Sequence, residues 1–221
     1  MKKAQSIIGL LFCILLCLPA GSIHKKVLDT LAAEFEMTIT SSNAQVSSFT
    51  AKNTGFTSGY EADECYNVTP AFIADNSDYA VFKYSNSTES FILYDDEVYS
   101  IGTCVGGFGI TSMALADLNK DGMYELYYTF SWGSGWHRSQ IGYFEPLNRK
   151  VNIFDYSLVD SDMILTVNKS GDLCVSSATL DLKDFVNFTI KAENLIGTVD
   201  YEGDRATLTI TQQKQEQSKN S

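Results

Sequence analysis

Short apolar runs alternate with polar breaks through most of the chain. From about Pro70 onward, β-branched and aromatic residues gather in short segments, and Gly, Asp, Asn and Ser interrupt them about every ten residues. Alternation on a period of two between turn residues is typical of antiparallel strands. The pattern predicts strands at residues 79–84, 90–94, 98–101, 109–116, 125–130, 141–144, 151–156, 164–167, 173–176, 195–201 and 206–211.

A different period occurs near the N-terminus. Apolar residues recur every fourth position and would form one stripe on a helix, at Ile23, Val27, Leu31 and Phe35. This spacing predicts a short amphipathic helix over residues 23–35. Residues 37–57 are rich in Ser, Thr and Asn and fit either a strand pair or an irregular segment, and residues 181–188 could hold one helical turn. The predicted class is mostly β, with antiparallel sheets arranged as a sandwich or as blade-like layers.

The first 22 residues have the pattern of a secretory signal peptide. Lys2 and Lys3 precede an apolar run at residues 7–18, and small residues follow it. The run is too short for a transmembrane helix, which needs about 20 apolar residues. Cleavage after Ala20 or Ser22 would leave one mostly β domain at residues 23–211 and a polar, disordered tail at residues 212–221.

The same pattern predicts a secreted or cell-surface protein. A lipid anchor is the alternative, because bacterial lipoproteins carry a cysteine after a small residue. Cys13 and Cys17 follow the bulky residues Phe12 and Leu16, which favours secretion over lipidation.

Charge excludes one class of partner. Removing residues 1–22 takes away two lysines and no acidic residue, which changes the formal net charge from −11 to −13. Such a surface repels phosphate backbones, so nucleic acid is not an expected partner.

Three cysteines remain after cleavage: Cys65, Cys104 and Cys174. An odd number cannot be fully paired within one chain, and three thiols fit neither a disulfide framework nor a four-ligand zinc site. A Cys65–Cys104 disulfide and three buried free thiols both remain open.

The strongest chemical motif is the segment DLNKDGMYEL, at residues 117–126. Calcium takes six to eight oxygen ligands, and a short loop supplies them from alternate side chains and a backbone carbonyl. A glycine at the sixth position, Gly122, permits the sharp turn. The predicted ligands are the side chains of Asp117, Asn119, Asp121 and Glu125 and the carbonyl of Met123.

The loop is not an EF-hand. That motif needs a bidentate Glu at the twelfth position, where this chain has Tyr128, and a helix after the loop. Residues 109–116 and 125–130 instead read as strands, so the expected unit is a calcium-loop hairpin. Because Asn119 lowers the ligand charge, we expect weak affinity, on the order of 0.1 to 1 mM. The competing interpretation is a polar hairpin turn that binds no metal.

Residues 109–128 resemble the calcium hairpin of FG-GAP and VCBS repeats, with the pattern D-x-[DN]-x-D-G-x-x-[DE]-L. The resemblance implies a metal role for Asp117, Asn119, Asp121 and Glu125. A multi-bladed propeller is not expected, because the signature occurs once and no repeat period is present. Residues 94–144 also resemble a group of secreted or lipid-anchored proteins of Gram-positive gut bacteria, which implies a location and no activity.

A second candidate region is SWGSGWHRS, at residues 131–139. Two tryptophans flank a Gly-Ser-Gly bend, which suggests a loop that contacts a glycan or a protein on a cell surface. The candidate ligand-binding residues are Trp132, Trp136, His137 and Arg138. The alternative is a structural corner in which the tryptophans cover the edge of the core.

No catalytic motif of the standard classes is present in the sequence. It lacks a G-x-S-x-G elbow, an H-E-x-x-H helix and a phosphate-binding loop. The acidic pairs Asp95–Asp96 and Asp160–Asp162 are expected in surface turns. The sequence therefore predicts an exported, calcium-stabilised β module. It would act as a surface or extracellular binding or structural protein and would have no catalytic activity. The alternative is a small secreted hydrolase that uses His137 or a carboxylate pair near the Trp132 to Trp136 loop.

Overall fold

Three antiparallel sheets form the body of the protein. The structure is a computed structural model, and it describes residues 30–32, 44–102, 106–182 and 188–211. Strands adjacent in sequence are adjacent in each sheet, apart from β1, which joins the edge of the second sheet. The first sheet contains β2 (Cys65–Asn67), β3 (Ala80–Tyr84), β4 (Ser90–Tyr94) and β5 (Glu97–Gly102).

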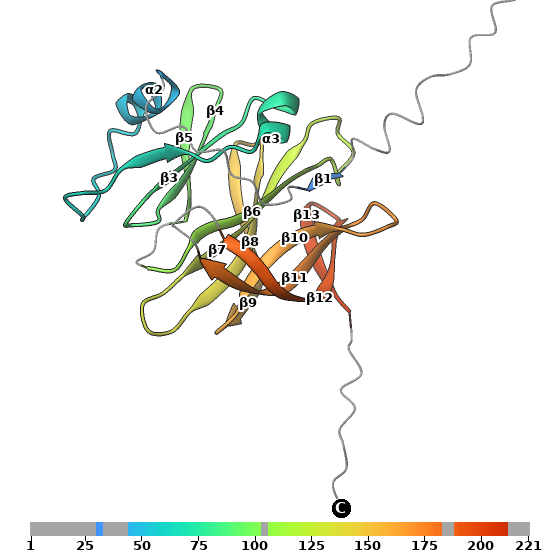
Figure 1. The fold of residues 1–221 in the computed structure, drawn as a ribbon. Helices are drawn as coiled ribbons and strands as arrows, with labels where there is room; N and C mark the ends of the chain where they lie inside the picture. The colour runs from blue at the N-terminus through green and yellow to red at the C-terminus, as the bar shows by residue number, and fades with distance from the viewer. Residues whose placement is uncertain (1–29, 33–43, 103–105, 183–187, 212–221) are drawn as a thin grey trace, which may run out of the picture.

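The second sheet has five strands and lies between the other two (Figure 1). Its order is β1 (Thr30–Ala32), β6 (Gly109–Ala116), β7 (Glu125–Trp132), β8 (Arg138–Glu145) and β9 (Lys150–Val159). The third sheet contains β10 (Asp162–Val167), β11 (Leu173–Leu182), β12 (Phe188–Glu202) and β13 (Arg205–Ile210).

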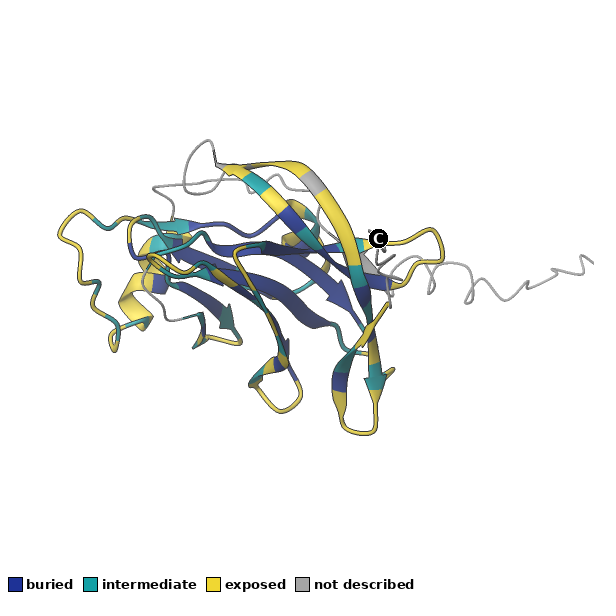
Figure 2. Ribbon diagram, turned by 90° about the horizontal axis from the view of Figure 1, so that it is seen from below, coloured by how far each residue is buried: buried dark blue, intermediate teal, exposed yellow. Residues whose placement is uncertain are grey.

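The inner strands of the central sheet are buried on both faces. All eight residues of β6 are buried. Ile110 and Met113 pack toward the β2–β5 sheet, whereas Ala114 and Ala116 belong to the cluster shared with the β10–β13 sheet. In Figure 2, buried residues follow the strands of the interior, and exposed residues mark the loops and parts of the outer strands. The two hydrophobic clusters thus join three layers, which matches the blade-like alternative of the predicted fold.

Hydroxyl groups of the central sheet bind the backbone of β10, which is an edge strand of its own sheet. Ser112 Oγ accepts a hydrogen bond from Leu165 N at 2.8 Å, and Ser139 Oγ accepts one from Met163 N at 3.0 Å. Thr111 Oγ1 donates to Met163 O at 3.1 Å. A register shift between Ile110 and Ser112 allows two neighbouring side chains to face β10. These bonds satisfy backbone groups that an edge strand would otherwise leave unpaired inside the protein.

The mostly β class and the antiparallel strands are confirmed. A short helix does occur near the N-terminus, but it is α2 (Ala44–Lys52), which covers the β2–β5 sheet through Phe49. The predicted helix at residues 23–35 is wrong where it can be compared, because Thr30–Ala32 form β1. The other residues of that range lie outside the described part of the chain. A second helix, α3 (Ala71–Asn76), precedes β3.

Two predicted segments lie outside the described residues: the signal peptide at residues 1–22 and the disordered tail at residues 212–221. Of residues 181–188, the described ones belong to β11 and β12 rather than to a helical turn. Within the described residues, none of the helices has the length and apolar character needed to span a membrane.

Two of the three cysteines that follow the predicted signal peptide are described. Cys65 is half-buried and Cys174 is buried, and both are free thiols. Cys104 itself lies outside the described residues. Burial raises the pKa of the Cys65 thiol to about 12.

Candidate metal site

The predicted calcium loop closes a hairpin between β6 and β7. The two strands pair in antiparallel register up to Ala116 and Glu125, whose Cα atoms are partners. The loop therefore spans residues 117–124, and Glu125 is the first residue of β7. The expected order of strand, loop and strand is present.

Side-chain oxygens of the loop turn inward and bind its backbone. Asp117 Oδ2 accepts a hydrogen bond from Gly122 N at 3.0 Å, and Asn119 Oδ1 accepts one from Asp121 N at 2.9 Å. Asp121 Oδ1 accepts a bond from Met123 N at 2.8 Å. These contacts hold the acidic and amide groups around one small volume.

Gly122 has a backbone φ of 91°, a conformation that residues with a Cβ rarely adopt. This is the role expected for the sixth position of the loop. Lys120 also has a positive φ, of 61°, which tightens the turn further.

Three carboxylates converge in the loop. Asp117, Asp121 and Glu125 each offer an oxygen, and these oxygens lie within 4.8 Å of one another. Asn119 lies in the same group, because its Nδ2 donates to Asp121 Oδ2 at 3.0 Å. The structure thus brings together four of the five predicted ligands through their side chains.

Two oxygens in this cluster lack a hydrogen-bond partner. Asp117 Oδ1 and Glu125 Oε1 are both buried and unpaired. A buried polar atom without a partner costs free energy, and a buried carboxylate costs more than a neutral group. A cation between these carboxylates would satisfy both atoms. The donor set consists of hard oxygens, the type of ligand that calcium prefers.

Glu125 is the most deeply buried of the three carboxylates. The residue is 0% exposed. Its pKa is raised to about 8, chiefly by burial and also by the charges of Asp121 and Asp117, while a hydrogen bond from Leu118 N opposes the rise. Without a cation, this carboxyl group is therefore largely protonated near neutral pH.

The candidate ligand loop is divided between core and surface. Trp132 ends β7 and is half-buried, with its ring 6.2 Å from that of Phe130. Trp136 is 72% exposed, and Arg138 is also exposed at the start of β8. Of the four candidates, Trp136 and Arg138 have exposed side chains, whereas Trp132 and His137 are half-buried.

His137 forms contacts inside the protein. Its Nε2 lies 2.6 Å from Asp162 Oδ1 and 3.1 Å from Ser131 Oγ. In a Ser-His-Asp relay, the serine and the aspartate use opposite ring nitrogens. Here one nitrogen faces both groups, and Ser131 is fully buried and accepts a hydrogen bond from Phe108 N. The arrangement is that of a structural bridge between the central sheet and β10.

The acidic pairs Asp95–Asp96 and Asp160–Asp162 lie in different parts of the fold. Asp95 and Asp96 lie in the turn between β4 and β5 and form ion pairs with Arg149 and Lys52. Asp160 lies in a turn with a φ of 56°. Asp162 was expected in the same surface turn, but its side chain is 8% exposed because it binds His137.

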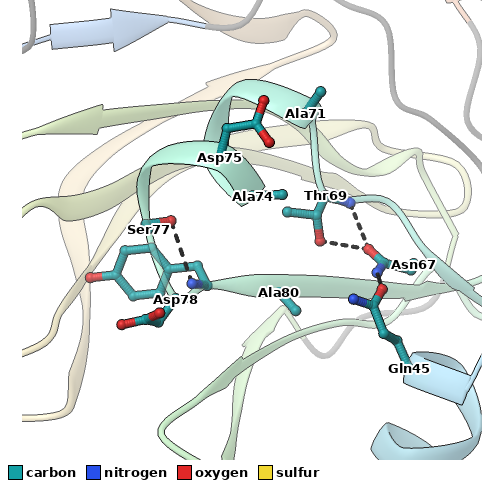
Figure 3. A pocket seen from close by; sticks show the side chains of 10 residues that line it. Gln45, Asn67, Thr69, Ala71, Ala74, Asp75, Ser77, Asp78 and Ala80 are labelled. Atoms are coloured by element: carbon teal, nitrogen blue, oxygen red, sulfur yellow. Dashed lines mark hydrogen bonds between the residues drawn. The ribbon is translucent and has the colours of Figure 1, made fainter.

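Two features have no local sequence signal. One is the hydrogen bond from Tyr79 Oη to Tyr124 O, which spans 45 residues of sequence. The other is a groove of about 440 Å³ beside α3 (Figure 3). Asn67 and Thr69 in its floor already bind each other, through Asn67 Oδ1 and the backbone N and hydroxyl of Thr69. These two polar side chains are therefore already paired with each other.

Comparison with protein-family models, with curated proteins and with solved structures gives no match.

Proposed function

We propose that this protein is an exported β module that binds calcium in the β6–β7 loop and uses the ion for stability rather than for catalysis. The observation that carries the proposal is the pair of buried, unpartnered oxygens, Asp117 Oδ1 and Glu125 Oε1. In a hairpin turn that binds no metal, burying both oxygens without partners would be energetically unfavourable. Export is supported by the signal-like pattern of residues 1–22.

The proposed calcium ligands are the side chains of Asp117, Asn119, Asp121 and Glu125 and the carbonyl of Met123. Calcium would neutralise the repulsion between the three carboxylates, two of which already raise the pKa of Glu125. A structural role fits, because every ligand belongs to one hairpin and no histidine or nucleophile belongs to the cluster.

A partner on a cell surface, either a glycan or a protein, is the proposed target of Trp136 and Arg138. Exposed Trp and Arg side chains are common centres of binding energy. The loop that presents Trp136 turns tightly: a Cβ on Gly133 would lie 2.0 Å from Trp136 O. A fixed loop loses little conformational entropy on binding, which favours recognition.

Hydrolysis through His137 has less support. Its Nε2 faces Asp162 and Ser131 together, and Ser131 is buried. A carboxylate pair near the Trp132 to Trp136 loop has no better basis, because Asp162 binds His137 and Asp160 lies in a turn.

Calcium titration by calorimetry tests the proposal, with the mature chain first stripped by EDTA. We expect one site with a Kd on the order of 0.1 to 1 mM. At tenfold excess over Kd, the ion should stabilise the protein by about 1.4 kcal/mol. Absence of both heat and a calcium-dependent rise in melting temperature would refute the metal site. Asp121→Ala should remove both signals.

A further inference from the structure

Tyr124 occupies a special position in the calcium loop. It lies between Met123, whose carbonyl is a proposed ligand, and Glu125, whose carboxylate is another. Any contact that fixes the Tyr124 peptide therefore constrains two ligands. The inference below rests on the proposed calcium site.

Tyr79 makes such a contact from another layer of the fold. Its hydroxyl donates a hydrogen bond of 2.6 Å to Tyr124 O. In the sequence, Tyr79 lies between α3 and β3 and immediately precedes β3. The contact thus joins the loop of the central sheet to the first sheet.

The Tyr79 side chain has little freedom to move. It is 4% exposed, and its ring centroid lies 5.0 Å from that of Tyr94 and 5.8 Å from that of Phe144. Burial raises the pKa of the Tyr79 hydroxyl, so the group remains a proton donor at physiological pH. A side chain held in this way can position the backbone that it binds.

A surface pocket separates part of the loop from the end of α3. It has a volume of about 140 Å³, and Ser77, Tyr79, Met123, Tyr124 and Pro146 are among the residues that border it. The Tyr124 side chain packs against the hydrophobic cluster that includes Tyr79. The hydroxyl contact therefore adds a directional bond to the backbone of the loop beside this pocket.

We infer that Tyr79 is a positioning residue of the calcium site and transmits calcium binding to the β2–β5 sheet. When the ion fixes the Met123 carbonyl and the Glu125 carboxylate, it also fixes the Tyr124 carbonyl that Tyr79 binds. Coupling of this kind is reciprocal: if calcium strengthens the Tyr79 contact, the contact must strengthen calcium binding equally. Calcium then fastens two layers of the fold together rather than stiffening one hairpin alone.

The test compares two substitutions that each remove one buried hydroxyl. Tyr79→Phe keeps the ring and loses the bond to Tyr124. Tyr128→Phe is the matched control, because the Tyr128 hydroxyl is buried in the same hydrophobic cluster and has no hydrogen-bond partner. Calcium affinity is measured by calorimetry with calcium chloride, well below the melting temperature. We expect Tyr79→Phe to raise the Kd about three- to tenfold, somewhat below the usual effect of losing an outer-shell partner, and Tyr128→Phe to leave it unchanged.

Hydrogen exchange provides a readout that simple destabilisation would not reproduce. In the wild type, calcium should slow exchange in peptides covering residues 71–84 as well as in residues 117–125. In Tyr79→Phe, the protection of residues 117–125 should remain at saturating calcium, and that of residues 71–84 should be lost.

Three results would overturn the inference. The first is a Tyr79→Phe variant with wild-type affinity and wild-type exchange. The second, which holds even if that variant does not fold, is wild-type protein in which calcium protects residues 117–125 and leaves residues 71–84 unaffected. The third is wild-type protein that binds no calcium, which would reject the proposed function as well and so differs from the first two.

Discussion

Glu125 and Asp117 face each other across the β6–β7 turn: Glu125 is buried, Asp117 is half-buried, and each has one buried oxygen that lacks a hydrogen-bond partner. Two like charges in such a position destabilise the fold unless a proton or a cation compensates them. The arrangement therefore favours a compensating proton or cation in the loop.

The first prediction separates the charge of Glu125 from its shape. Glu125→Gln keeps the side-chain volume and removes the buried charge. In EDTA at pH 8, the variant should be at least as stable as the wild type, because it no longer buries a carboxylate. Calcium should raise the melting temperature of the wild type and leave that of the variant almost unchanged. Thermal unfolding with and without 10 mM calcium measures both effects.

The control for this prediction is magnesium, which prefers a smaller, near-octahedral set of ligands and retains its waters. It should stabilise the wild type less than calcium at the same concentration. A Glu125→Gln variant that gains as much from calcium as the wild type does would show that the ion binds elsewhere.

The second prediction concerns pH. In the metal-free protein, Glu125 has a pKa of about 8, above its ordinary value of 4.5. The folded state then binds a proton more tightly than the unfolded state does, so this stability is complete below about pH 4.5 and is lost as the pH rises through 8. Urea unfolding in EDTA should show that stability falls between about pH 5 and pH 8 and levels off above that range.

Calcium should abolish that fall, because the bound ion keeps Glu125 ionised. Calcium affinity should accordingly rise over the same pH range, and binding near pH 7 should release close to one proton. Glu125→Gln in EDTA serves as the baseline for all other titrating groups. An equal pH slope in that variant would assign the effect to a different residue.

The sequence predicted the hairpin more reliably than it predicted the layers. Residues 117–125 carry local information, since the alternating acidic positions and Gly122 are adjacent in sequence. The three-layer arrangement has no such local cue: β6 is buried on both faces, so it shows no polar face from which its neighbours could be deduced.

The wrong helix near the N-terminus and the unpredicted contact between Tyr79 and Tyr124 have a similar cause, because both depend on interactions between residues far apart in sequence. The stripe containing Leu31 fits a helix by spacing, yet Leu31 pairs with Leu115 in a sheet, which is a long-range interaction. The helix that does form contains Ser and Thr and buries only Phe49 among its residues, so its periodic signal is weak. The Tyr79 contact with Tyr124 could not be predicted, because its donor lies in no recognisable motif.

The third prediction distinguishes the two tryptophans. Trp136→Ala should change the free energy of unfolding by no more than about 0.5 kcal/mol, because the side chain is 72% exposed. Trp132→Ala should cost about 2 kcal/mol, because that ring packs against Phe130. Urea unfolding measures both values.

The same variants test the proposed binding surface. In a pull-down with cell-wall material, Trp136→Ala should lose retention while its folding remains intact. Retention equal to that of the wild type would exclude Trp136 from the interface and favour a purely structural role for the loop.

The last prediction concerns the bridge between His137 and Asp162. His137→Ala would leave the Asp162 carboxylate, which is 8% exposed, without its partner at 2.6 Å. We expect a loss of about 2 kcal/mol in the free energy of unfolding, since an unpaired buried charge is costly. Asp162→Asn should cost less, because an amide can still bind the imidazole. Arg138→Ala is the control next in sequence, and it should be nearly neutral because its side chain is exposed. A His137→Ala variant that kept full stability but lost a measurable hydrolytic turnover would reverse this assignment and make His137 a catalytic residue.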